Sequence, residues 1–155
     1  MTPGSRKYIL DTHLFIQGFR EPAANEALQR FHRSYAPFEY LSAVVVQELR
    51  SGVRAARERQ LLERHVINVF DRTGRVITPT VRAWQKSGDL LADMARRDGL
   101  DVSSVSKAFG NDFLLALSCR EAGCVLVTDN ERDFARIRTF VPFEFVRAWP
   151  RPVVS

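Results

Sequence analysis

The sequence contains only two cysteines, Cys119 and Cys124, among 155 residues. Neither their number nor their spacing indicates a disulfide framework or a zinc site, so we expect a reduced, cytoplasmic environment. No apolar run approaches the length of a membrane span. The apolar run at 8–10 is stopped by Asp11 and is too short for the core of a secretory signal peptide, which we therefore do not expect.

Internal repeats, low-complexity tracts and long linkers are also missing, and the seven prolines and eight glycines are scattered. A hydrophobic fraction of 45% and a charged fraction of 26% are ordinary for a globular protein. A chain of this length can bury a substantial core in one domain. We predict a single domain over residues 1–155, with frayed ends at about 1–6 and 150–155.

The charge balance favours the basic side. Lysines and arginines number 23 against 18 acids, which gives a net charge of +5, and the pI is about 9.8. This balance permits a polyanionic partner such as a nucleic acid. The argument gains force if several acids gather in one pocket, because the remaining surface is then more basic than the total suggests.

Hydrophobic periodicity predicts strands that alternate with helices, which is typical of an α/β fold with a mostly parallel sheet. A run of valines at 44–46 leaves a strand open as an alternative to a helix there. The segment 99–108 is expected to be a serine-rich loop. The expected strands are 7–10, 38–41, 75–78, 124–127 and 143–146, and the expected helices are 23–32, 43–53 after a Ser42 cap, 54–70, 80–97, 111–121 and 130–138.

Two acids directly follow predicted strands. Asp11 follows Tyr-Ile-Leu, and Asp129 follows Cys-Val-Leu-Val-Thr. The carboxyl ends of parallel strands form the edge where α/β folds bind their ligands, although aspartate is also common in turns and helix caps. Asp133 lies one helical turn beyond Asp129 and can reach the same place, or it can pair with an arginine on the surface.

Two further acids interrupt the apolar faces of predicted helices. On a helical wheel Glu48 falls between Val44 and Val45, where it must reach solvent, pair with an internal arginine or bind something. Asp112 opens a helix that is apolar nearly all round. The helix dipole favours an acid in the first turn, but this does not explain why a buried helix begins with one.

Four acids from distant parts of one chain suggest a shared divalent cation bound by oxygen. Thr12 and Thr128 each neighbour one of these acids and can orient it or a bound water, or they are ordinary residues at strand ends. The arginine-rich stretch 50–64 is usually a solvated helix face and sometimes a phosphate track. Within it, Arg50, Arg54 and Arg57 are our candidates for contacts with RNA.

The chain resembles PIN-domain proteins, and most of all the VapC-type toxin ribonucleases of bacterial toxin–antitoxin pairs. The resemblance rests on the order and spacing of four segments. These are ILDT at 9–12, VVQEL at 45–49, NDFLLALS at 111–118 and VTDNERDF at 127–134. Gly123 also fits the pattern.

This resemblance implies a three-layer α/β/α sandwich and an endoribonuclease that depends on Mg²⁺ or Mn²⁺. In such an enzyme a metal-activated water hydrolyses an RNA phosphodiester. The metal ligands and catalytic acids would be Asp11, Glu48, Asp112 and Asp129, with Asp133 as a less certain ligand. The number of metal ions, one or two, is left open. The resemblance also implies a cytoplasmic homodimer that a small antitoxin protein neutralises.

Other functions were weighed against this one. A PIN-like module could bind RNA or protein without cutting, and a nuclease could process RNA without being a toxin. A phospho-aspartate enzyme is disfavoured because His13 stands two residues after Asp11, where the phosphatases have a second acid. A dinucleotide-binding enzyme is disfavoured because no Gly-x-Gly-x-x-Gly follows the first strand.

Overall fold

The computed structural model describes residues 6–99, 101, 103 and 105–151, which form a mixed α/β structure around one sheet. The strand order is β3-β2-β1-β4-β5, and each neighbouring pair is parallel. This confirms the predicted fold class. The strands are β1 (Lys7–Leu10), β2 (Glu39–Ser42), β3 (Val76–Ile77), β4 (Cys124–Thr128) and β5 (Glu144–Arg147).

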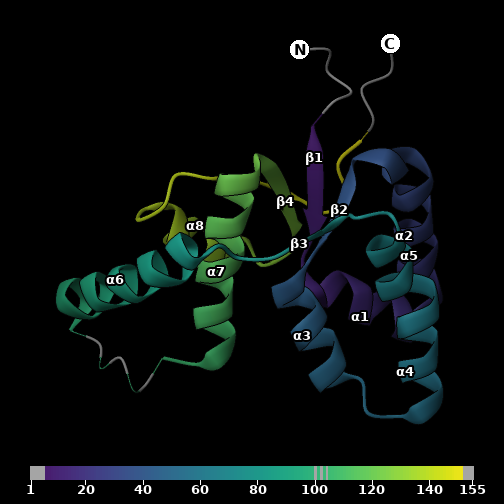
Figure 1. The fold of residues 1–155 in the computed structure, drawn as a ribbon, viewed down its shortest axis with the longest axis horizontal. Helices are drawn as coiled ribbons and strands as arrows, with labels where there is room; N and C mark the ends of the chain where they lie inside the picture. The colour runs from purple at the N-terminus through teal and green to yellow at the C-terminus, as the bar shows by residue number, and fades with distance from the viewer. Residues whose placement is uncertain (1–5, 100, 102, 104, 152–155) are drawn as a thin grey trace.

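Helices cover both faces of the sheet. Figure 1 shows α6, α7 and α8 on one side of the strands and α1, α2, α4 and α5 on the other. Helix α3 extends from the end of β2 and lies between α1 and α7. The helices are α1 (Thr12–Arg20), α2 (Pro22–Tyr35), α3 (Ala43–Gly52), α4 (Ala56–Leu62), α5 (Asn68–Arg72), α6 (Val81–Asp98), α7 (Lys107–Ala122) and α8 (Glu131–Arg138), with a 3₁₀ turn at Ala36–Phe38 and a π turn at Glu63–Ile67.

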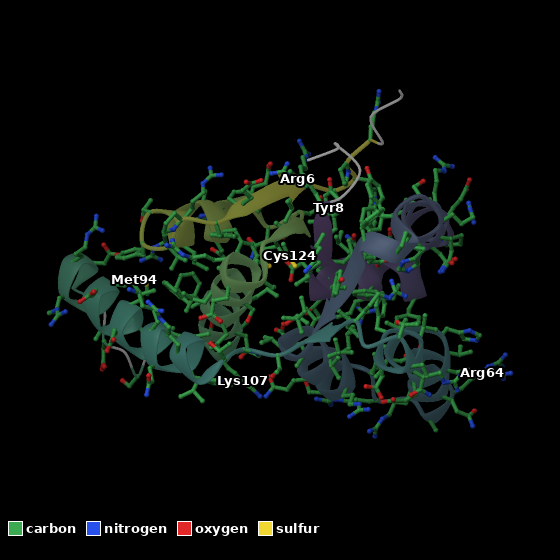
Figure 2. All side chains as sticks on the ribbon, turned by 45° about the horizontal axis from the view of Figure 1, so that its top comes forward. Arg6, Tyr8, Arg64, Met94, Lys107 and Cys124 are labelled. Carbon is green, nitrogen blue, oxygen red and sulfur yellow. The ribbon has the colours of Figure 1, made fainter. Side chains whose placement is uncertain are left out.

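The centre of the sheet is buried because helices cover both of its faces. All five residues of β4 are buried, as are Ile9 and Leu10 of β1. The register of β1 on β4 places Leu10 beside Val127. Figure 2 labels Tyr8 and Cys124 on these two neighbouring strands. This register brings the carboxyl ends of β1 and β4 level with each other.

Helix α1 was not predicted from the sequence. Asp11 acts as its N-cap, because its side chain accepts a hydrogen bond from the Thr12 amide. Buried Leu14 and Phe15 anchor the helix in the core. Helices α1 and α2 approach closely at Gly18, where an added Cβ would lie 2.7 Å from a Leu28 methyl carbon. The sequence signal was therefore present at Asp11, but the helix is short and contains a glycine.

Helix α7 begins four residues before its predicted start at 111. Ser106 is the N-cap and accepts a hydrogen bond from the Phe109 amide, so the predicted loop 99–108 is shorter than expected, and its residues 100, 102 and 104 lie outside the described residues. The prediction that Asp112 occupies the first turn is wrong. Asp112 lies in the second turn, where the helix dipole gives it little support.

The remaining elements agree with the sequence analysis in kind. Ser42 accepts a hydrogen bond from the Val44 amide and starts α3, so the strand alternative for 44–46 is wrong. The predicted helix 54–70 is α4 and α5 joined by the π turn. Gly123 ends α7 in the left-handed conformation, with φ at +68°.

Two properties of the chain as a whole complete the fold. In the described part of the chain, none of the helices has the length and apolar character needed to cross a membrane. The predicted frayed ends fall mainly on residues 1–5 and 152–155, which lie outside the described residues. Arg6, the first described residue, forms an ion pair with Glu144 of β5.

Candidate functional site: an acidic cavity at the carboxyl ends of β1 and β4

The acidic cavity, as we call it, has a volume of about 920 Å³. It lies where β1 and β4 end, which is also where the strand order reverses direction. Such a point leaves a crevice beyond the strand ends in an open parallel sheet, and ligands bind there. The five acids singled out in the sequence all line this one cavity: Asp11, Glu48, Asp112, Asp129 and Asp133.

Asp11 forms the floor of the cavity and is only 7% exposed. Its amide donates a 3.0 Å hydrogen bond to the Val127 carbonyl, which continues the β1–β4 ladder. Its carboxylate accepts 2.8 Å hydrogen bonds from the Thr12 amide and the Thr128 hydroxyl. Burial raises the pKa of Asp11, while the hydrogen bonds from Thr128 and Thr12 act in the opposite direction.

Glu48 approaches Asp11 from helix α3. It is half-buried, and its Oε1 accepts a 2.8 Å hydrogen bond from the Thr12 hydroxyl. Thr12 therefore binds both acids, one through its amide and one through its side chain. Burial is the main cause that raises the pKa of Glu48, and the charge of Asp11 adds to it.

The pKa of Asp112 is strongly raised. Burial and, to a smaller extent, the charges of Asp11, Glu48 and Asp133 together raise it to about 8. The next seven residues of α7 are all buried, so the apolar helix holds this carboxylate in place beside its neighbours. At neutral pH Asp112 retains its proton for much of the time, and a cation in the cavity would relieve the repulsion that keeps the proton there.

Asp129 and Asp133 lie on the more open side of the cavity. Asp129 directly follows β4 and is exposed, whereas Asn130 is the N-cap of α8. The Asn130 side-chain amide donates a 3.1 Å hydrogen bond to Asp133. The negative charge of Asp129 contributes to the raised pKa of Asp11, and that of Asp133 contributes to the raised pKa of Asp112.

The chemistry of the donors fits a hard divalent cation. Within residues 6–99, 101, 103 and 105–151, none of the five acids forms an ion pair with lysine, arginine or histidine. Five carboxylates that form no ion pair in the described part of the chain provide the oxygen ligands that Mg²⁺ and Mn²⁺ prefer. In the described part of the chain, no group of three or more possible ligand side chains is close enough to hold an ion by itself. The acids are therefore spaced more widely than the ligands of a closed coordination shell.

The three arginines proposed for RNA contacts do not line the cavity. Arg50 forms an ion pair with Glu63 at 2.7 Å, which occupies its guanidinium. Arg54 and Arg57 are exposed around the start of α4.

The cavity-lining residues that sequence reasoning missed include Arg136 and Phe109. Arg136 lies three residues after Asp133 on α8, so helical spacing alone could have placed it beside that acid. Phe109 was missed because α7 was expected to begin at 111. Asn111, which the prediction did not assign to the site, lowers the pKa of Glu48 through a hydrogen bond between the side chains.

The fold and the cavity together define a parallel α/β protein with a cluster of acids at the switch point of its sheet. A family model described as "PIN domain" matches residues 8–139. The chain therefore belongs to the PIN-domain family. No curated protein sequence matches the chain at a significant level.

Solved structures with the same fold include toxin–antitoxin assemblies. FitAcB from Neisseria gonorrhoeae matches with a TM-score of 0.64 and 19% identity, covering 89% of this chain and 95% of that one. DNA-bound VapBC from Salmonella typhimurium matches with a TM-score of 0.64 and 23% identity, covering 92% and 98%. A toxin–antitoxin complex from Klebsiella pneumoniae matches with a TM-score of 0.53 and 18% identity, covering 94% and 100%.

Proposed function

We propose that this protein is a metal-dependent endoribonuclease and the toxin of a type II toxin–antitoxin system. The observation that carries the proposal is the convergence of five acids from β1, α3, α7 and the β4–α8 segment in one cavity, without ion-pair partners in the described part of the chain. Hydrolysis of a phosphodiester is the reaction that such a set of oxygen ligands supports on a basic protein. Membership of the PIN-domain family and the toxin–antitoxin complex among the neighbouring structures support the toxin assignment.

In this proposal Asp11, Glu48, Asp112 and Asp129 hold the cation directly or through water, with Asp133 as a further ligand. A bound Mg²⁺ or Mn²⁺ would acidify a water molecule and offset negative charge on the phosphate. Thr12 and Thr128 fix the carboxylates of Asp11 and Glu48 before substrate arrives. One of the acids accepts the proton from the attacking water.

The alternative of a PIN-like module that binds without cutting explains the cavity less well. Burial and the charges of neighbouring acids raise the pKa of Asp11, Glu48 and Asp112, which is a cost in folding free energy at neutral pH. A module that only binds RNA or protein gains nothing from this repulsion. A nuclease that is not a toxin would use the same residues, and only an assay in cells separates the two.

The proposed partners are an RNA substrate, a small antitoxin and a second copy of this chain, in the cytoplasm. The homodimer is supported by two exposed apolar side chains one turn apart on α6, Val81 at 74% and Trp84 at 58%. Contiguous exposed apolar patches mark protein interfaces, and tryptophan is enriched in them. The neighbouring structures include VapBC and FitAB complexes, which supports the antitoxin partner.

The proposal is tested by incubating the protein with total cellular RNA in Mg²⁺, in Mn²⁺ and in EDTA. We expect cleavage with either metal, none in EDTA and none for Asp11→Asn. The matched control is Asp89→Asn, an exposed acid on α6 outside the cavity, which should cleave like the parent. Equal cleavage by Asp11→Asn and the parent would contradict the proposal.

A second experiment separates a toxin from a processing enzyme. Overproduction of the parent in bacteria should slow growth, and Asp11→Asn should not. If the parent cleaves RNA in vitro but growth is unchanged, the protein is a nuclease with another role in the cell.

A further inference from the structure

Basic side chains line the surface around the carboxyl end of α7. Two cavities of about 440 and 490 Å³ adjoin there and share Arg120 and Pro142 in their walls. We call the two cavities together the basic groove. Figure 2 labels two of its residues, Arg6 and Cys124. The basic side chains of the groove come from the segment before β1 and from α6, α7 and α8: Arg6, Arg82, Lys86, Arg120 and Arg138.

The basic groove is separate from the acidic cavity, although both lie along α7. Asp112 and Arg120 are eight residues apart on this helix. At a rise of about 1.5 Å per residue, roughly 12 Å of helix axis separates the two positions. No described residue lines both the acidic cavity and the basic groove. The groove is therefore a second surface, which the proposed chemistry does not use.

Most of the positive charge in the basic groove is not neutralised. Of the two acids that line it, Glu144 pairs with Arg6, and Glu121 accepts a 2.7 Å hydrogen bond from the Thr80 hydroxyl. Among the described residues, the other four basic side chains form no ion pair, and all four are exposed. Like charges that share one groove repel each other, and an anion that enters the groove relieves this repulsion.

Two of the guanidinium groups in the groove are held in place. Arg120 donates a 3.1 Å hydrogen bond from Nη1 to the Pro142 carbonyl. The guanidinium carbon of Arg138 lies 4.4 Å from the centroid of the Phe145 ring. Side chains that are already anchored lose less entropy when they bind a ligand. Guanidinium groups also present a planar set of donors that matches the oxygens of a phosphate.

The charges of the whole chain are divided between these two regions. Five of the 18 acids line the acidic cavity, so the rest of the chain carries 13 acids against 23 lysines and arginines. A polyanion that brings one phosphate to the five acids is repelled there by their charge. Basic groups elsewhere on the surface attract the same polyanion and offset this repulsion.

The extent of the groove favours a chain of phosphates over a single one. Its basic side chains line two adjoining cavities and belong to three helices and the segment before β1. One phosphate can contact one or two of these side chains, whereas successive phosphates of a nucleic-acid backbone can contact all of them. Contacts of this kind supply affinity without sequence specificity.

We propose that the basic groove binds the sugar–phosphate backbone of the RNA substrate at a distance from the bond that is cut. This inference rests on the proposed function and names a second contact with the substrate of that function. Arg120 and Arg138 hold phosphates of a flanking segment while the acids act on the scissile phosphate. An RNA gains from the groove only if it is long enough to reach both regions.

The first test is binding of a fluorescein-labelled RNA of about 20 nucleotides, measured by fluorescence anisotropy, with all proteins carrying Asp112→Asn and kept in EDTA. We expect Arg120→Ala and Arg138→Ala each to weaken binding several-fold and to reduce the slope of log Kd against log salt by about 0.7. Arg120→Lys keeps the charge and should retain most of that slope. The control is Arg54→Ala, which removes an exposed arginine outside the groove and should leave binding and slope unchanged.

The second test measures cleavage by proteins with all five acids intact, in Mg²⁺ or Mn²⁺. For the long RNA, the double variant Arg120→Ala/Arg138→Ala should raise KM about tenfold and change kcat less than about twofold, as expected for loss of binding that does not alter the chemical step. The shortest RNA that the parent cleaves should show a much smaller change. An equal fall in kcat/KM for both RNAs would show damage to the acids instead and would overturn the inference.

Two further results would overturn it. One is a double variant that binds the long RNA as tightly as the protein with Asp112→Asn alone. The other is displacement of the labelled RNA by AMP at the same molar concentration as by unlabelled RNA, which would show a site for a small phosphate ester. Neither result affects the proposed function, which depends on cleavage by the acids. Conversely, RNA that stays uncut with either metal but shows the expected binding losses would refute the nuclease and retain the groove.

Discussion

The Thr128 hydroxyl donates a 2.8 Å hydrogen bond to Oδ2 of Asp11 and so joins the ends of the two strands between which the strand order reverses. Thr128 is fully buried, and its oxygen also accepts a 2.9 Å hydrogen bond from the Asn130 amide. One hydroxyl therefore fixes the acid on β1 and the start of the segment that carries Asp129 and Asp133.

Thr128→Val should lower both stability and cleavage. It keeps the shape of the side chain but leaves the buried Asp11 carboxylate without one donor, which costs about 1–3 kcal/mol of unfolding free energy. The pKa of Asp11 should rise further, since this hydrogen bond lowers it. Thermal melts and RNA cleavage measure the two effects. Thr128→Ser keeps the hydroxyl and is the control; equal loss in both variants would refute this role.

Asp112→Asn should abolish cleavage and leave the protein folded. In EDTA the variant should melt at the same temperature as the parent or several degrees higher, because one repelling charge is removed from the cavity. Mg²⁺ should raise the melting temperature of the parent more than that of the variant. A variant that melts well below the parent in EDTA would show that Asp112 makes a favourable contact instead.

The stability of the metal-free protein should fall as the pH rises from about 4 to about 8. The pKa of Asp112 is raised from 3.8 to about 8, so between these values the folded state binds more protons than the unfolded state. The stabilising contribution of this group is complete below pH 3.8 and is lost as the pH approaches 8. Denaturant melts in EDTA at several pH values measure it. In Asp112→Asn the decline should be smaller, and an identical decline would contradict the assignment.

Trp84→Glu should convert the proposed homodimer into a monomer. A buried charge at an apolar contact between subunits costs more free energy than the contact supplies. Light scattering coupled to gel filtration measures the mass of each form. Gln85→Glu, which adds the same charge at the next exposed position of α6, is the matched control. A parent that is already monomeric at high concentration refutes the dimer.

The sequence predicts the sheet well because short apolar runs that end in an acid are a strong local signal. The end of β1 before Asp11 and the end of β4 before Asp129 follow from such signals. The end of α7 follows from a different signal, the glycine at position 123. It predicts helix starts less well. Ser106 begins α7 four residues earlier than apolar periodicity suggests, because periodicity does not register a first turn that contains Lys107 and Gly110.

The acids of the cavity are visible in the sequence because a charge on an apolar face is unusual wherever it occurs. Glu48 and Asp112 could be identified in this way without any knowledge of the fold. Phe109 could not, because an aromatic residue near a helix end is ordinary in any chain. Helical spacing could place Arg136 beside Asp133 but does not by itself mark it as part of a site. Their meaning depends on the meeting of α6, α7 and α8, which only the tertiary structure supplies.

The position of β1 in the middle of the sheet has a consequence for how the protein is made. Its two neighbours come from opposite parts of the chain, β2 at residues 39–42 and β4 at residues 124–128. The chain must therefore be synthesised through β4 before Asp11 can meet Thr128. A product that ends before β4 lacks Thr128, Asp129 and Asp133, so it cannot assemble the acidic cavity.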